Sequence, residues 1–197
     1  IRDRFYGGLV RKKNVVNTMM TSIFIIGIGI VMWVLFGYSL SFAPSGNAFI
    51  GDFRWLGLEG VSLTEGYTDD ASIPNMVFSA FQMMFAVITP ALITGAVAGR
   101  MKFKSIFVFT IFWSLIVYYP LAHMVWGQGG LLGADGIGAL DFAGGDVVHI
   151  SSGVSALVLC ILLGKRHDYE HSIYRIHNIP TVVLGASLLM FGWFGFN

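Results

Sequence analysis

Charge is scarce in this sequence, and long polar segments are few. Charged residues make up 12% of the 197 residues, about half of the share in a soluble domain. Apolar residues make up 55%, and the mean hydropathy is +0.73. Residues 15–43, 71–99, 105–122 and 178–197 carry no charged side chain, and His149 alone interrupts the apolar run 147–164. Each run reaches the roughly 17 to 25 residues with which a helix crosses the hydrocarbon core. The composition excludes a soluble domain and predicts an all-α, polytopic transmembrane helix bundle.

We predict five membrane spans and one long outer loop within a single unit, residues 1–197. The outer loop covers residues 44–73, where Gly, Asp, Ser and Thr separate short apolar patches. The spans cover about residues 15–43, 74–99, 104–123, 143–164 and 178–197.

Cysteine and the common catalytic motifs are also missing. Cys160 is the only cysteine, so no disulfide can form within the chain. The sequence contains no nucleotide-binding loop, nucleophile elbow or metal-binding motif, which argues against an enzyme and against a cofactor, a metal or a nucleic-acid partner. It also lacks an initiator Met and a signal-peptide pattern, and "GWFGFN" ends it directly after an apolar run. We therefore expect a fragment of a longer protein.

The basic residues are distributed unevenly between the predicted spans. All of them except Arg54 lie before residue 15, between residues 99 and 105, or between residues 164 and 178. Five crossings put these three segments on one side, which the positive-inside rule makes cytoplasmic. Eight of the 11 acids lie on the other side or at the outer ends of spans, where they favour the approach of cations.

Glycine is frequent, with 25 residues, many of them inside the predicted helices. Small residues let helices approach closely in lipid, where little hydrophobic force acts between them. Gly95 and Gly99 form a GxxxG pattern of this kind. We expect a tightly packed bundle.

The stretch "DFAGGDVVHI", residues 141–150, places acids and a histidine at the start of an apolar run. Asp141 and His149 would lie about 12 Å apart along one straight helix and about 80° apart around it, so both can face the same interior. Asp141 is suited to cap the helix, and this does not exclude a second role beside a bound cation. His149 is an ionisable residue within a span, which indicates function, although a neutral histidine bonded to a neighbouring helix is the alternative.

Aromatic side chains gather near the predicted outer ends of the spans. Phe81 and Phe85 lie four residues apart on one helix face, and Trp126 ends the third span. An interfacial aromatic belt explains such positions without any binding function. An indole above an acidic surface also meets the requirement of a cation–π site. The residues alone leave both interpretations open.

Taken together, several segments resemble the ammonium transporter family, Amt/Mep/Rh. The segments run in the family's order through nearly the whole chain, and the block 120–151 is the most specific. They are "FYGGLVRKKN" (5–14), "FGYSLSF" (36–42), "FQMMFAVITPALITGAVAGR" (81–100), "YYPLAHMVWGQGGLL" (118–132), "DFAGGDVVHIS" (141–151), "HNIP" (177–180) and "GWFGFN" (192–197).

The resemblance implies half of an eleven-helix ammonium transporter fold, from the end of helix 1 through helix 6. Members of the family form homotrimers with a narrow hydrophobic pore in each subunit, in the plasma membrane or the bacterial inner membrane. The implied orientation agrees with the one derived from the basic residues. Roughly half of the family's length is represented.

The same resemblance implies the roles of particular residues. Trp126 and Phe85, with Phe81 nearby, match the outer ammonium site. Phe85 and Phe196 match the stacked rings that gate the pore. His149 matches the first of two pore histidines, and Asp141 matches the acid beneath the outer vestibule.

The implied activity is the passage of ammonium or ammonia, with methylammonium as a related substrate. The gate strips water from the ion, and the histidines relay its proton separately from the neutral amine. A cytoplasmic regulator is an implied partner. Two positions depart from the family pattern: Asp146 stands where a neutral residue is usual, and Gly99 stands where an acid commonly precedes the Arg.

Two alternatives remain at this point. A membrane ammonium sensor would bind at Trp126 and Phe85 and would signal through a fused cytoplasmic domain. An unrelated helix bundle that serves as an interaction protein would require that the motif agreement be accidental.

Overall fold

The computed structural model describes residues 7–44, 47–134, 136–166, 169 and 175–196. Within these ranges every regular element is a helix, apart from an isolated antiparallel bridge between Gly66 and Pro74. The prediction of an all-α chain is confirmed.

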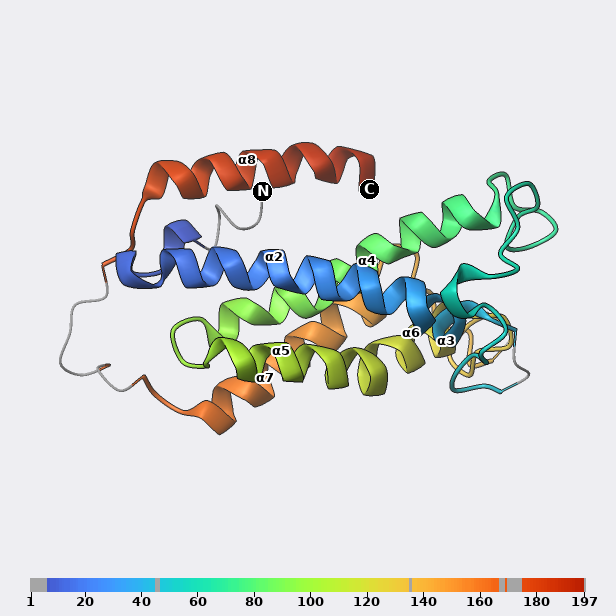
Figure 1. Ribbon diagram of the computed structural model, residues 1–197, viewed down its shortest axis with the longest axis horizontal. Helices are drawn as coiled ribbons and strands as arrows, with labels where there is room; N and C mark the ends of the chain where they lie inside the picture. The colour runs from blue at the N-terminus through green and yellow to red at the C-terminus, as the bar shows by residue number, and fades with distance from the viewer. Residues whose placement is uncertain (1–6, 45–46, 135, 167–168, 170–174, 197) are drawn as a thin grey trace.

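From Lys12 onward, the described residues form three long rods and two further helices (Figure 1). Each of the three segments η2, η4 and η5 is a stretch of π-helix. The first rod comprises η1 (Lys12–Asn14), α2 (Val15–Met32), η2 (Trp33–Gly37) and α3 (Tyr38–Phe42). The second rod is α4 (Asn75–Val97), and the third comprises α5 (Phe103–Trp113), η4 (Ser114–Tyr118) and α6 (Tyr119–Trp126). The two further helices are η5 (Gly145–Ile150) with α7 (Ser151–Leu163), and α8 (Ile179–Phe196). A short turn, η3 (Leu56–Leu58), lies in the outer loop.

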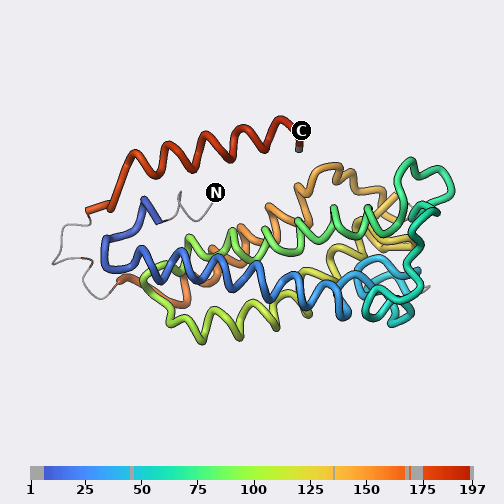
Figure 2. Tube along the Cα trace, turned by 45° about the horizontal axis from the view of Figure 1, so that its top comes forward, coloured from blue at the N-terminus to red at the C-terminus, as the bar shows by residue number. Residues whose placement is uncertain are grey.

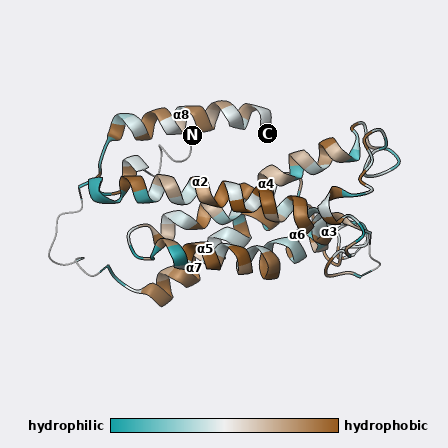
Figure 3. Cartoon of the chain, in the orientation of Figure 1, coloured by the Kyte–Doolittle hydropathy of each residue, from teal (hydrophilic) through white to brown (hydrophobic). Residues whose placement is uncertain are grey.

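Four of these helical segments are long and apolar enough to cross a membrane. They cover Lys12–Phe42, Asn75–Val97, Phe103–Trp126 and Gly145–Leu163, and α8 contributes a further, shorter apolar helix. Most of the length of these helices is hydrophobic, whereas hydrophilic residues gather at the helix ends and in the loops (Figure 3). This distribution is the one expected when lipid is the solvent of the helix surfaces.

Helix α4 holds the bundle together. It packs against α2 and against α7, and α3 packs against α6 (Figure 2). Helix α8 lies apart from the bundle in both views. Its approach is fixed at one end, where the backbone N–H groups of His177 and Asn178 donate to the carbonyl oxygen of Gly8, at 3.1 and 3.2 Å.

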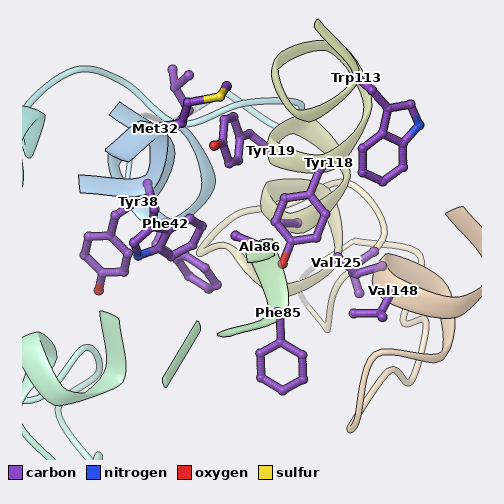
Figure 4. Close-up of a cluster of buried hydrophobic side chains, with 14 of the residues drawn as sticks. Met32, Tyr38, Phe42, Phe85, Ala86, Trp113, Tyr118, Tyr119, Val125 and Val148 are labelled. Carbon is purple, nitrogen blue, oxygen red and sulfur yellow. The ribbon is translucent and has the colours of Figure 1, made fainter. Parts of the chain in front are cut away.

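An aromatic core fills the bundle where the first and third rods cross. Trp33 and Tyr119 are fully buried, with ring centroids 6.1 Å apart, and Tyr38 stacks on Phe42 at 5.5 Å (Figure 4). Gly37 allows this packing, because a Cβ atom there would lie 2.8 Å from the ring of Tyr119. Close packing through a glycine therefore occurs at this crossing.

The GxxxG interpretation of Gly95 and Gly99 is wrong. Helix α4 ends at Val97, and Gly99 follows it with φ +71°, a left-handed conformation that favours glycine. The backbone N–H of Arg100 then donates to the carbonyl oxygen of Val97 at 2.9 Å. Gly99 ends a helix, and it does not supply a helix-packing face.

Candidate functional site

Three aromatic side chains from two helices form the centre of the candidate site. Phe81 and Phe85 lie one helical turn apart on α4, with ring centroids 5.0 Å apart and edge to face. Trp126, the last residue of α6, meets Phe85 in the same way at 5.7 Å. Phe85 is buried and Trp126 half-buried, whereas Phe81 is 53% exposed. The structure thus brings together the three aromatics that the sequence analysis placed at the outer site.

Asp141 holds the indole of Trp126 in place through its backbone. The indole N–H of Trp126 donates to the carbonyl oxygen of Asp141 at 2.8 Å. Because this bond fixes one edge of the indole, the ring is held beside Phe85 with its orientation defined.

The carboxylate of Asp141 caps the helix that begins with η5. Its Oδ1 atom accepts from the backbone N–H groups of Gly144 and Gly145, at 2.6 and 2.7 Å. Its Oδ2 atom accepts from those of Asp146 and Val147, at 2.8 and 3.0 Å. Four amide groups that a helix start leaves without partners are thereby satisfied by one anion at the positive end of the dipole.

Asp141 and His149 do not share one straight helix. Gly144 lies between them with φ +88°, and the helix that follows starts with a stretch of π-helix. The distance and angle derived from regular α-helical spacing therefore do not apply to this pair.

A pocket of about 400 Å³ opens beside Trp126 and Asp141, and Tyr67, Gln128 and Phe142 also line it. The hydroxyl of Tyr67 donates to the carbonyl oxygen of Phe42 at 3.0 Å and accepts from the backbone N–H of Gln128 at 3.1 Å. The amide Nε2 of Gln128 donates to the carbonyl oxygen of Tyr67 at 3.0 Å. Burial raises the pKa of Tyr67 to about 12. These bonds join the outer loop to the segment after α6.

Tyr67 and Gln128 were not predicted as site residues. Gln128 lies in the motif block "YYPLAHMVWGQGGLL", which was a usable signal. Tyr67 lies in a long loop without a motif, and only the chain path brings it to Trp126.

His149 lies outside the aromatic group. Its side chain is exposed on η5, and its ring centroid is 6.5 Å from that of Trp193 on α8. Phe196, the other predicted gate residue, ends α8, and its side chain lies outside the described residues. The side chain of Asp146 is half-buried, and nothing in the structure explains the acid at this position.

His123 is a further histidine to which the sequence gave no role. It is fully buried in α6, with Nδ1 3.1 Å from the carbonyl oxygen of Ser41 and Nε2 2.8 Å from that of Asn47. It connects the end of α3 and the outer loop to α6. Within the described ranges, no group of three or more His, Cys, Asp or Glu side chains could hold a metal ion.

A sequence model of the Ammonium Transporter Family matches residues 4–197. An ammonium transporter of Bacillus subtilis is 53% identical over 193 residues. The chain belongs to the ammonium transporter family.

Curated members of the ammonium transporter family are similar over almost the whole chain. The Bacillus subtilis protein covers 98% of this chain, and the chain covers 46% of that protein. Ammonium transporter Amt1 of Archaeoglobus fulgidus is 42% identical, with the same coverage of 98% and 46%. The chain therefore spans about half the length of these family members.

Solved structures show the family's fold in this chain. Mep2 of Candida albicans is 36% identical, with a TM-score of 0.83 over 98% of this chain and 43% of that one. A structure described as a sensor Amt protein is 30% identical, with a TM-score of 0.82 over 100% of this chain and 49% of that one. The predicted fold class, a transmembrane helix bundle of the ammonium transporter type, is confirmed by these likenesses and by the helical architecture.

Proposed function

We propose that the protein transports ammonium across a membrane through a hydrophobic pore. The observation that carries this proposal is the edge-to-face group of Phe81, Phe85 and Trp126 next to the pocket that Asp141 lines. The names of the similar family members support ammonium as the substrate.

The aromatic group is suited to receive a cation that has lost part of its water. Ammonium resembles the head group of lysine, whose pKa is about 10.4, and so it is charged at neutral pH. A partly desolvated cation above an aromatic face gains roughly 1 to 2 kcal/mol. Trp126 supplies such a face, and its bond to the carbonyl of Asp141 keeps the face oriented before the ion arrives.

Below this site, Phe85 and Phe196 form the gate, and His149 takes part in a proton relay. Taking a charged group through the bilayer centre costs several kcal/mol even on the lower scales. Ammonium avoids this cost if it gives up its proton and crosses as neutral ammonia, while the proton passes separately along the histidines. Potassium has no proton to give, so such a pore rejects it.

Asp141 stabilises the outer vestibule by capping the helix that carries His149. The protein works without a cofactor, in the plasma membrane or the bacterial inner membrane, as a homotrimer. Native mass spectrometry of the intact protein tests the assembly: the expected mass is three times that of the subunit, and a monomer alone would contradict it.

Currents across liposomes test the proposed route. We expect ammonium-dependent currents in the wild type and their loss, by more than about tenfold, when His149→Ala and Phe85→Ala are combined. Phe112→Ala is the matched control, because Phe112 lies on α5 with 58% of its side chain exposed and away from the site. Unchanged currents in the double variant would show that the route is wrong.

A membrane ammonium sensor is the second candidate, favoured by the likeness to the sensor Amt structure. A sensor binds ammonium at Trp126 and Phe85 without measurable flux, and Trp126→Ala abolishes its signalling. Binding and flux measured on one preparation separate the candidates: saturable flux identifies a transporter, and binding without flux identifies a sensor.

A further inference from the structure

A proline interrupts the backbone bonding of α4 next to the candidate site. Pro90 lies inside this helix, four residues after Ala86 and five after Phe85. Because proline has no backbone N–H, the carbonyl oxygen of Ala86 cannot accept the regular helical bond from it. The turn of α4 that follows Phe85 therefore lacks one of the bonds that hold the rest of the helix.

Thr89 adds a bond in the same turn. It is fully buried, and its hydroxyl donates to the backbone carbonyl oxygen of Phe85 at 2.5 Å. A hydroxyl has one proton and two lone pairs, so Oγ1 of Thr89 can only accept from a further partner. The side chain of Thr89 is thus tied to the residue that carries the aromatic ring.

Tyr118 supplies the further donor from the third rod. This residue ends η4, is fully buried and makes a side-chain hydrogen bond with Thr89. Its hydroxyl points toward the part of α4 that carries Phe85 and Ala86 (Figure 4). Because the only proton of the Thr89 hydroxyl goes to Phe85, Tyr118 must donate to Thr89. A chain of bonds therefore runs from Tyr118 through Thr89 to the carbonyl oxygen of Phe85, and bonds in such a chain strengthen one another in a dry interior.

The third rod holds Phe85 at two points. Trp126, at the end of this rod, contacts the ring, with centroids 5.7 Å apart. Tyr118 reaches the backbone of Phe85 through Thr89. Contact with Trp126 alone would not fix the backbone of a turn that Pro90 weakens, because helices bend at proline. The second attachment fixes this backbone and so defines the place of the ring.

We propose that Thr89 is a positioning residue for Phe85 and that Tyr118 acts with it. By fixing the turn between Phe85 and Pro90, the two hydroxyl groups set where the ring stands at the outer site. The place of the ring does not depend on what the protein transports. The effect of Thr89 on ammonium currents, in contrast, rests on the proposed function.

Fluorine NMR of the intact protein in detergent tests the position of the ring. 4-Fluorophenylalanine in place of Phe85 gives a resonance that reports the surroundings of the ring. Thr89→Val removes the hydroxyl and keeps the shape of the side chain, Thr89→Ser keeps the hydroxyl, and Tyr118→Phe removes the donor. Thr21→Val is the matched control, because Thr21 is buried in α2 and its hydroxyl likewise donates four residues back, to the carbonyl oxygen of Asn17 at 2.7 Å.

We expect Thr89→Val and Tyr118→Phe to shift or split the resonance in the same direction. Their combination should go no further than Thr89→Val alone, because that variant already removes the whole chain of bonds. Thr89→Ser and Thr21→Val should leave the resonance as it is in the wild type. In liposomes, Thr89→Val should lower the ammonium currents by about threefold or more, and Thr89→Ser should keep them at the wild-type level.

Three results would overturn the proposal. The first is an unshifted resonance in Thr89→Val, or the same shift in Thr21→Val. The second is a Thr89→Ser variant that behaves like Thr89→Val, because the hydroxyl would then not be the group that places the ring. The third is an unshifted resonance in Tyr118→Phe, which would remove the link to the third rod.

The currents separate this proposal from the proposed function. A wild type without ammonium currents would contradict transport, and the resonance would still decide the role of Thr89. Unchanged currents in a Thr89→Val variant with a shifted resonance would overturn the effect of Thr89 on transport and leave its role in placing the ring.

Discussion

Asp141 serves two neighbours through two different groups. Its carboxylate accepts four backbone N–H groups at the start of η5, and its carbonyl oxygen accepts the indole N–H of Trp126. The start of one helix and the orientation of an aromatic ring at the end of another therefore depend on the same residue. A change at Asp141 should therefore affect both stability and the outer site.

Replacement of Asp141 should destabilise the protein. Asp141→Ala removes all four acceptor contacts of the cap, and we expect it to lower the free energy of unfolding by about 1 to 2 kcal/mol. Asp146→Asn is the control, because Asp146 lies in the same first turn and enters the cap only through its backbone N–H. Thermal unfolding in detergent measures both. If Asp141→Ala lowered ammonium binding with no change in unfolding temperature, the cap would not be its main role.

At the scale of the elements, stretches of π-helix interrupt two of the four candidate spans, at η2 and η4, and a third stretch, η5, begins another span. A π turn inserts a residue into the helical repeat and shifts the faces on either side of it. In the first rod this shift lies at η2, which ends at Gly37, against the ring of Tyr119. The crossing of the first and third rods therefore depends on a glycine at one position.

Gly37→Ala should disturb this crossing. The added Cβ would lie 2.8 Å from the ring of Tyr119, and we expect a loss of about 1 to 3 kcal/mol in the free energy of unfolding. Gly27→Ala in the same rod is the matched control, because no atom lies within 4 Å of a Cβ there. That variant should be neutral or should gain up to about 1 kcal/mol from helix propensity. Equal unfolding temperatures for the two variants would contradict the proposed close contact.

The outer loop should loosen at high pH through Tyr67. Its neutral hydroxyl donates to Phe42, and burial raises its pKa to about 12, against about 10 in an unfolded chain. Its contribution to stability is complete below about pH 10 and is lost as the pH rises to about 12. Tyr67→Phe removes this pH dependence. The wild type should therefore lose its advantage in unfolding temperature over Tyr67→Phe as the pH rises through that interval. A constant difference across the interval would rule out Tyr67 as the titrating group.

At the scale of the whole molecule, the basic residues at the helix ends predict one orientation of the bundle in the membrane. Arg100 and Arg166 lie at one end of the bundle, where they join α4 and α7. Helices α3 and α6 end near the long loop at the other end of the bundle (Figure 1). The pocket lined by Tyr67, Trp126 and Asp141 lies where α6 ends. The positive-inside rule predicts that the arginine end is cytoplasmic and that the aromatic pocket faces outward.

Cysteine labelling tests this orientation. In a Cys160→Ala background, Asp70→Cys should react with a maleimide that does not cross membranes when it is added to intact cells. Lys102→Cys should react only after the cells are made permeable. Asp70 and Lys102 are both exposed, so accessibility within the fold does not distinguish them. The opposite labelling pattern would reverse the assignment of the outer site.

The sequence by itself determined the class of protein and most of the candidate site. Long uncharged runs require helices when lipid is the solvent, and the uneven distribution of basic residues predicts their direction. The motif segments 81–100, 118–132 and 141–151 also singled out Phe85, Trp126 and Asp141 as candidates. These properties depend on local composition and spacing, which can be read along the chain.

Only the tertiary structure decided how these residues meet. It placed Asp141 ahead of the helix start, joined Trp126 to its carbonyl, and brought Tyr67 from a loop without a motif to the same pocket. It also showed that Gly99 ends a helix where the sequence suggested a packing face. A left-handed glycine and contacts between segments far apart in the chain depend on the path of the backbone, which the regular repeat of a helix does not contain.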